Sequence, residues 1–299
     1  MKMNNCVLLC TIGMLAEMAG AKTNSTIVGT NIGGWMVLEP WITPSLFYRF
    51  LGKTRSEKVG WDSYTFCEAL GPEKGNQVMK EHWDTWYTED HIKNLSDRGV
   101  KMVRLPIGDW TLEPYGPYIG CMDGAEEKIT WMLDTCEEHG IQVWLEVHAW
   151  NGSQNGFDNS GQASQVNWLN ETHFEHWPTR TSEWLGHWNI TTKQYDEMYP
   201  DNVKRSIKIC IDLLKKWGQH YALSAFQPVN EPWEFSDLPL LKSFYTAVRR
   251  MVQVLAKPGT KFVFHDHAIN MPMNATDWND LFNDTEDIVL DHHYYQAWN

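Results

Sequence analysis

The most chemically suggestive run in the chain is Asn230-Glu231-Pro232, which directly follows a short apolar segment predicted to be a strand. Burial at a strand end raises the pKa of a carboxylic acid toward the working pH, which suits it to general acid or base catalysis. The amide of Asn230 is placed to hold a substrate hydroxyl. For this tripeptide alone, a loop carboxylate before a turn-forming proline is an equally good interpretation.

Polar side chains also end the other predicted strands. They are Glu39, Arg104, His148, His265 with Asp266, and His292-His293 with Tyr294-Tyr295. Functional groups at the C-terminal ends of successive parallel strands are typical of a (β/α)8 barrel. The pair Gly33-Gly34 does not complete the glycine-rich turn of a dinucleotide-binding sheet. We therefore predict an α/β fold of the TIM-barrel type, in which Arg104 could alternatively be a structural bridge between acids in the barrel floor.

Short β-branched runs alternate with helical patterns from residue 27 onward, which predicts a parallel sheet. The predicted strands are 27–38, 100–107, 141–147, 222–229, 261–265 and 287–291, and the predicted helices are 77–98, 129–139, 203–217, 240–255 and, more weakly, 277–282. Gly99, Gly140 and Gly218 are the expected helix C-caps. Only about six of the eight strands can be identified, so we expect an incomplete barrel over residues 22–299.

Residues 161–201 stand apart because they are rich in Trp, His, Asn and Thr and show no clear periodicity. A segment this long without regular elements is usually functional or mobile. We predict an insertion over the mouth of the barrel that is helical in part. The chain has 17 Trp, most of which we assign to the core, although the flat face of an indole also suits a sugar ring.

The net charge of the chain and its N-terminal sequence limit the classes of partner that the protein can bind. The 299 residues carry 38 acidic against 25 basic side chains and no basic block, which excludes nucleic acid as a partner. Residues 1–21 are predicted to be a secretory signal, with Lys2 before an apolar run and Ala19-Gly20-Ala21 at the cleavage site. No other stretch reaches the roughly 18 apolar residues of a membrane span. We expect a secreted, extracellular or cell-wall monomer with no membrane contact after signal removal.

Glycosylation sites and cysteines agree with secretion. Asn-x-Ser/Thr sequons begin at Asn24, Asn94, Asn151, Asn170, Asn189, Asn274 and Asn283. Signal removal leaves Cys67, Cys121, Cys136 and Cys210, which allow three disulfide pairings. Neither the cysteines nor the histidine pairs around His265 and His292 show a typical ligand spacing, and adjacent strand residues face opposite ways. We therefore expect no metal and no cofactor.

Taken together, these motifs give a specific resemblance. The chain resembles glycoside hydrolase family 5 in the retaining (β/α)8 clan, and within it the secreted exo-β-1,3-glucanases of fungi. The matching segments lie in order between residues 29 and 296, at 33–47, 82–89, 103–110, 152–161, 230–232 and 291–296, with His148. The resemblance implies hydrolysis of a β-glucan polysaccharide or oligosaccharide from its non-reducing end, releasing glucose by double displacement.

The resemblance also implies a role for each matching residue. Glu231 would be the general acid/base, Asn230 would bind the sugar 2-hydroxyl, and Arg104 would orient carboxylates beneath the sugar. The remaining implied contacts are His148, His293 and Tyr295 around the cleaved sugar, Glu39, Asp158 and Asn159 on the hydroxyls of the terminal glucose, and Phe157 with Trp298 as an aromatic clamp for the next glucose. Carboxylates and amides bind hydroxyls and aromatic rings cover apolar sugar faces, so these residue types suit a carbohydrate.

Two departures from the family pattern stand out. After His148 the chain reads Ala149-Trp150-Asn151-Gly152 where the family usually has Gly-Ala-Pro-Gly, which affects linkage specificity. Retention also requires a second carboxylate about 5–5.5 Å from the first. The family supplies it as a Glu on the seventh strand, and no such segment occurs before Asn299. We expect the chain, taken as it stands, to be C-terminally truncated and inactive.

Two alternatives come from other functional classes. A non-catalytic β-glucan-binding protein would retain glucan without releasing glucose. Another β-glycanase of the same family, an endo-glucanase or a mannanase, would release oligosaccharides from within the chain, but the loop 152–161 argues against it because it closes one end of the cleft.

Overall fold

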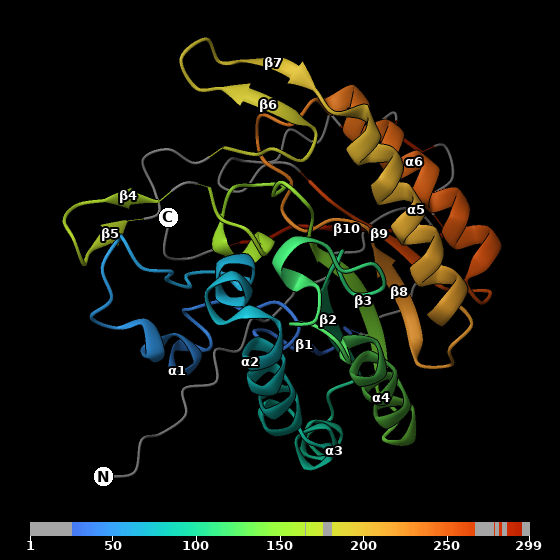
Figure 1. The fold of residues 1–299 in the computed structure, drawn as a ribbon. Coiled ribbons are helices and arrows are strands. Elements are labelled where there is room, and N and C mark those ends of the chain that lie inside the picture. The colour runs from blue at the N-terminus through green and yellow to red at the C-terminus, as the bar shows by residue number, and fades with distance from the viewer. Residues whose placement is uncertain are drawn as a thin grey trace.

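The computed structural model describes residues 26–164, 166–175, 181–266, 278, 281–282 and 286–294. Its centre is a six-stranded parallel sheet in which spatial order follows chain order (Figure 1). The strands are β1 (Gly29–Asn31), β2 (Met102–Gly108), β3 (Gln142–Ala149), β8 (Leu223–Gln227), β9 (Lys261–His265) and β10 (Ile288–Asp291). The predicted strand 261–265 is confirmed, whereas the predicted strand 27–38 is only three residues long because Gly33 and Gly34 turn the chain away.

The strand register fixes which polar residues meet. β2 and β3 are buried along nearly their whole length, as expected for a parallel sheet covered on both faces. In this register Arg104 pairs with Asn31 on one side and with Trp144 on the other, and Asp291 pairs with His265. Because parallel strands end at the same edge of a sheet, the polar residues at their carboxyl ends share that edge.

Helices pack around the sheet and follow the strands in chain order (Figure 1). The longer helices are α2 (Ser63–Trp86), α3 (Glu89–Asp97), α4 (Ala125–Glu138), α5 (Pro200–Trp217) and α6 (Leu238–Leu255), and the short ones are α1 (Pro44–Phe47), η1 (Tyr48–Phe50), η2 (Gly116–Tyr118) and η3 (Asp158–Ser160). The prediction of one helix over 77–98 is wrong. The chain leaves the helix at Tyr87, and Thr88 and His91 form a new capping box that starts α3.

Within the insertion 161–201, the described residues form two β-hairpins where partial helix was expected, and helix α5 begins only at Pro200. The hairpins are β4 (Asn167–Trp168) with β5 (Phe174–Glu175), and β6 (Gly186–Asn189) with β7 (Gln194–Met198). Each turn is stabilised by an asparagine: Asn170 Oδ1 accepts from the backbone of Thr172, and Asn189 Oδ1 from that of Thr191. Such Asx turns compete with helix formation and favour a chain reversal.

The core is unusually aromatic. Five tryptophans are fully buried, at Trp35, Trp83, Trp144, Trp150 and Trp184. One disulfide, Cys67–Cys121, ties α2 to the segment after η2, and Cys136 and Cys210 are buried thiols. Of the pairings left open by the sequence, the structure therefore contains one bridge rather than two.

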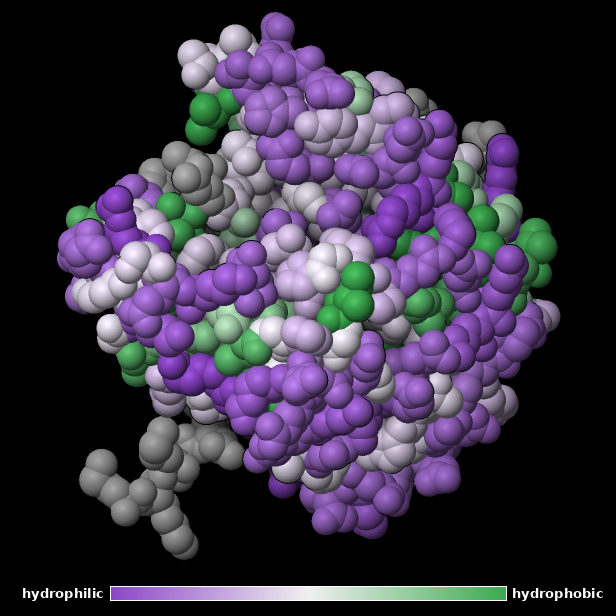
Figure 2. All heavy atoms as spheres, in the orientation of Figure 1, coloured by the Kyte–Doolittle hydropathy of each residue, from purple (hydrophilic) through white to green (hydrophobic). Residues whose placement is uncertain are grey.

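The face of the molecule drawn in Figure 2 is mostly hydrophilic, with small separated hydrophobic patches. Among the described residues, none of the helices combines the length and the apolar character needed to cross a membrane.

Candidate active site

Arg104 on β2 is the centre of a buried polar network at the carboxyl edge of the sheet. Its side chain is 4% exposed and lies 3.4 Å from Glu146 Oε2 and 3.9 Å from Asp291 Oδ2. It donates to Asn230 Oδ1 across 2.7 Å. Arg104 thus contacts two carboxylates and also fixes the orientation of the Asn230 amide. The structure thus brings Arg104 together with Asn230 and two acidic groups.

Glu146, in the interior of β3, was not identified from the sequence. It is completely buried, and its Oε2 lies 2.7 Å from His148 Nδ1 as well as close to Arg104. His148 Nε2 in turn lies 3.5 Å from Asn230 Nδ2. The sequence signal that could have identified Glu146 is its position two residues before His148, because residues i and i+2 of a strand share a face. An acid two positions before a site histidine therefore belongs to the same site.

Glu231 is held in a strained loop between two side chains. Its φ of +41° lies in the left-handed region, which non-glycine residues seldom adopt. Oε1 lies 2.6 Å from His293 Nδ1, and Oε2 accepts from Asn159 Nδ2 at 3.2 Å. Strain of this kind persists where the surroundings over-determine a conformation, and it is concentrated at functional sites.

His293 and Asp291 set the charge around Glu231. His293 Nε2 lies 3.1 Å from Asp291 Oδ2. Burial disfavours the charged imidazolium, but Asp291 and Glu231 outweigh it and raise the pKa of His293 to about 10. Burial likewise opposes ionisation of Asp291, yet His293, His265 and Arg104 hold its pKa well below its usual range. The site therefore contains a histidinium between two carboxylates at neutral pH.

The loop 152–161 is locked onto these strand ends. Gln154 is fully buried, and its Nε2 donates to the carbonyl oxygens of His148 at 2.7 Å and Asn230 at 3.0 Å. Gly152 has a φ of +81°, and a Cβ there would lie 2.5 Å from the carbonyl oxygen of Glu183. Both the positive φ and the close approach of the Glu183 carbonyl oxygen therefore exclude a side chain at this position. The loop thereby places Asn159 against Glu231.

Glu39 lies in the turn after the first strand, half-buried and in the electrostatic field of the site. Loss of hydration raises its pKa to about 7, with His148 and Arg104 lowering it and Asp158 and Glu231 raising it. These interactions bring Glu39 into the same cluster as the residues on β2, β3 and the loop. Tyr295 and Trp298 lie outside the described residues, so the predicted clamp of Trp298 with Phe157 remains a prediction.

An aromatic cluster beside the Glu231 loop was also not identified as a unit from the sequence. Trp188 on β6 stacks on Phe235 with ring centroids 5.0 Å apart and an interplanar angle of 8°. Trp233 meets Trp188 edge to face at 5.5 Å, and Tyr195 on β7 donates through its hydroxyl to the Phe235 carbonyl oxygen. The β6–β7 hairpin of the insertion is therefore anchored to the segment that follows Glu231.

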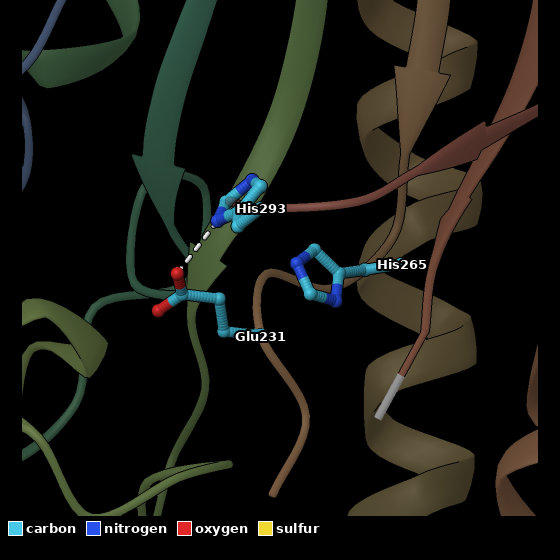
Figure 3. Close-up of side chains that lie close together, drawn as sticks. All are labelled: Glu231, His265 and His293. Carbon is cyan, nitrogen blue, oxygen red and sulfur yellow. Dashed lines mark hydrogen bonds and ion pairs between the residues drawn. The ribbon is translucent and has the colours of Figure 1, made fainter. Parts of the chain in front are cut away.

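Glu231, His265 and His293 converge, although no ligand spacing in the sequence indicates it (Figure 3). One potential ligand atom from each lies within 4.8 Å of the other two. They come from the loop after β8, from the end of β9 and from the segment after β10, so only the sheet brings them together. Spacing along the chain carries no signal for such a cluster.

Solved structures define the class of fold. A rutinosidase from Aspergillus niger superposes with a TM-score of 0.65 at 17% sequence identity, over 96% of this chain and 70% of that one. A second solved structure, AoRut, gives a TM-score of 0.63 at 20% identity. The likeness shows the fold, which is a (β/α)8 barrel of which six strands are described here.

Comparison with curated proteins gives relatives of one particular kind. The chain is 31% identical over 284 residues to a glucan 1,3-beta-glucosidase of Pichia angusta, 32% over 282 to a sporulation-specific glucan 1,3-beta-glucosidase of Saccharomyces cerevisiae, and 34% over 284 to a glucan 1,3-beta-glucosidase of Lachancea kluyveri. These matches cover 91–92% of this chain and 56% of each relative. The chain thus spans little more than half the length of these relatives. No protein-family model matches it.

Proposed function

We propose that the whole protein is a secreted exo-β-1,3-glucanase of glycoside hydrolase family 5, and that the described residues form its acid/base and sugar-binding part. The observation that carries the proposal is the setting of Glu231, clamped between His293 and Asn159 beside an Asn230 whose amide is fixed by Arg104. The similarity to glucan 1,3-beta-glucosidases over most of the chain supports the substrate class.

In the proposed reaction Glu231 passes to the glycosidic oxygen the proton that it shares with His293, and later activates water. His293 Nδ1 holds that proton and lies 2.6 Å from Oε1. Arg104 occupies Asn230 Oδ1, which leaves Nδ2 of the amide to meet the 2-hydroxyl. We assign no nucleophile among the described residues, and double displacement needs a second carboxylate.

Sugar recognition is proposed for the groups around Glu39 and the loop 152–161. Glu39, Asp158 and Asn159 would hold hydroxyls of the terminal glucose, with His148 and His293 lining the position of the cleaved sugar. Asn159 already donates to Glu231, so it would orient the acid/base as well as the substrate. Closure of one end by this loop favours removal of terminal glucose.

Secretion is part of the proposal. The disulfide Cys67–Cys121 is typical of an oxidising compartment, and the sequon residues Asn94 and Asn170 are exposed. N-terminal sequencing of the secreted protein should begin at Lys22. A start at Met1 would contradict the predicted signal.

The decisive experiment compares products from laminarin for the whole secreted protein and two variants. Glu231→Gln should lower kcat by about 10²–10⁴-fold, because it removes the acid/base and keeps the shape. Glu234→Gln is the matched control, since Glu234 is an exposed carboxylate three residues further along the same loop, and it should retain activity. Glucose should be the first product. Oligosaccharides would indicate an endo-acting enzyme, and glucan retention without glucose would indicate a binding protein.

A further inference from the structure

The cluster of Glu231, His265 and His293 contains a buried histidine nitrogen that the fold leaves unpaired. His265 is 0% exposed, and its Nε2 has no hydrogen-bond partner among the described residues. Figure 3 shows this edge of the ring facing the Glu231–His293 pair. An unpaired polar atom in a buried position costs free energy, so its retention requires a reason.

The opposite nitrogen of each histidine is already held in the way that metal sites hold theirs. His265 Nδ1 lies against the carbonyl oxygen of Asp266, and His293 Nε2 lies 3.1 Å from Asp291 Oδ2. Histidine ligands in proteins usually donate their second N–H to a carbonyl or carboxylate, which fixes the tautomer and aims the lone pair at the metal. This arrangement directs the unpaired Nε2 of His265 into the cluster, and in His293 it directs Nδ1 toward Glu231.

We propose that His265 Nε2, His293 Nδ1 and a carboxylate oxygen of Glu231 form a binding site for a divalent transition-metal ion, with Zn²⁺ as the best fit. Two imidazoles and one carboxylate are a common zinc ligand set that leaves a fourth position for water. Nitrogen donors disfavour Mg²⁺ and Ca²⁺, which prefer oxygen ligands. The three ligand atoms lie within 4.8 Å of one another, so small side-chain movements bring them to coordination distance.

The ion competes with one proton. In the metal-free site His293 Nδ1 carries the hydrogen that it shares with Glu231. Zinc binding breaks that N–H···O contact, forms the bonds from nitrogen and oxygen to the metal, and releases one proton to solvent. Asp291 and Glu231 retain their negative charges. These charges stabilise the bound zinc ion, just as they stabilise the proton on His293 in the metal-free site.

Zinc bound here removes Glu231 from proton transfer. This consequence, unlike the site itself, rests on the proposed function of Glu231. Zinc would then be a reversible inhibitor rather than a cofactor, and inhibition would weaken at lower pH as protons displace the metal. The loss of zinc binding and the loss of glucanase activity are separate measurements, so either proposal can fail alone.

The test is calorimetric titration of the whole secreted protein with Zn²⁺ at pH 7.5, with Co²⁺ as a spectroscopic substitute. We expect one ion per chain, and intense visible Co²⁺ absorption typical of a four-coordinate site. His265→Ala should weaken binding by more than about 100-fold, and Asp291→Asn by about 10–100-fold because it frees the second nitrogen of His293. His265→Cys should restore binding, since a thiolate is a zinc ligand.

His220→Ala is the matched control. His220 lies 3.0 Å from Asp134 and 3.7 Å from Glu137, which makes it a histidine–carboxylate group outside the cluster. Zinc affinity that is lost in His220→Ala, or that is unchanged in His265→Ala, overturns the proposal. So does the absence of binding at millimolar zinc. Circular dichroism of each variant establishes whether it is folded. If His265→Ala does not fold, the zinc affinities of Asp291→Asn and His265→Cys test the proposal instead.

Discussion

The guanidinium of Arg104 donates to Oδ1 of Asn230 across 2.7 Å, although the two residues are 126 positions apart in the chain. The same guanidinium lies near Glu146 and Asp291. One side chain on β2 therefore connects β3, the loop after β8 and β10. A buried cation in this position has consequences for stability as well as for the site.

Arg104→Met should destabilise the fold by about 3–5 kcal/mol, because it leaves buried carboxylates without their cation. Urea denaturation of both proteins measures the difference. Arg55→Met is the control, since Arg55 and Glu171 are 58% and 71% exposed and their ion pair should contribute less than about 1 kcal/mol. Equal effects of the two substitutions would contradict the central position of Arg104.

The ion pair of His293 with Asp291 predicts a loss of stability in alkali. The pKa of His293 is raised from its ordinary value of 6.5 to about 10, so its stabilising contribution is complete below pH 6.5 and is lost as the pH rises to 10. Unfolding free energies of the protein and of His293→Gln should therefore converge between pH 6.5 and 10. A constant difference over that range would show that His293 is not held as a cation.

Under the proposed function, Glu39 should make the affinity for glucan depend on pH. Its pKa of about 7 means that raising the pH from 6 to 8 converts a neutral acid to a carboxylate, which accepts stronger hydrogen bonds from sugar hydroxyls. Laminaritriose should bind several-fold more tightly at pH 8, and Glu39→Gln should remove this dependence. Glu68→Gln, an exposed change on α2, should preserve it. A dependence that survives in Glu39→Gln would assign the titration to another group.

The disulfide Cys67–Cys121 predicts a large effect of reduction. Cys67 and Cys121 are 54 residues apart, and a closed loop of that length stabilises by about 4 kcal/mol in the chain-entropy model. Thermal unfolding of the double variant Cys67→Ala/Cys121→Ala should show a correspondingly lower Tm. Adding a reductant to the unmodified protein should have a similar effect, and adding it to the double variant should have none. A variant as stable as the parent would contradict this expectation.

Periodicity and glycine caps predicted most of the barrel. The strand 261–265 is found at its predicted bounds, and Gly99 and Gly140 follow α3 and α4 with positive φ as helix-ending glycines do. The insertion could not be predicted in this way, because its hairpin turns depend on the side chains of Asn170 and Asn189 rather than on apolar spacing.

The candidate site was predictable where a motif ended a strand, as at Asn230-Glu231. Glu146 was missed because it lies inside an apolar strand, where a charged residue is tolerated only through its contacts with Arg104 and His148. His265 was missed as a neighbour of Glu231 because three separate segments bring the two together. Such convergence is a property of the sheet and has no counterpart in local sequence.

The agreement between strand order in space and in the chain has a consequence for biosynthesis. As the ribosome releases the polypeptide, each new strand of the sheet can join an edge that already exists, from β1 through to β10. Arg104 is synthesised early and His293 late, so the nascent chain carries an unfinished polar network until β10 docks. Under the proposed function, glucan added to stalled ribosomes should therefore bind only chains long enough to expose His293 beyond the exit tunnel.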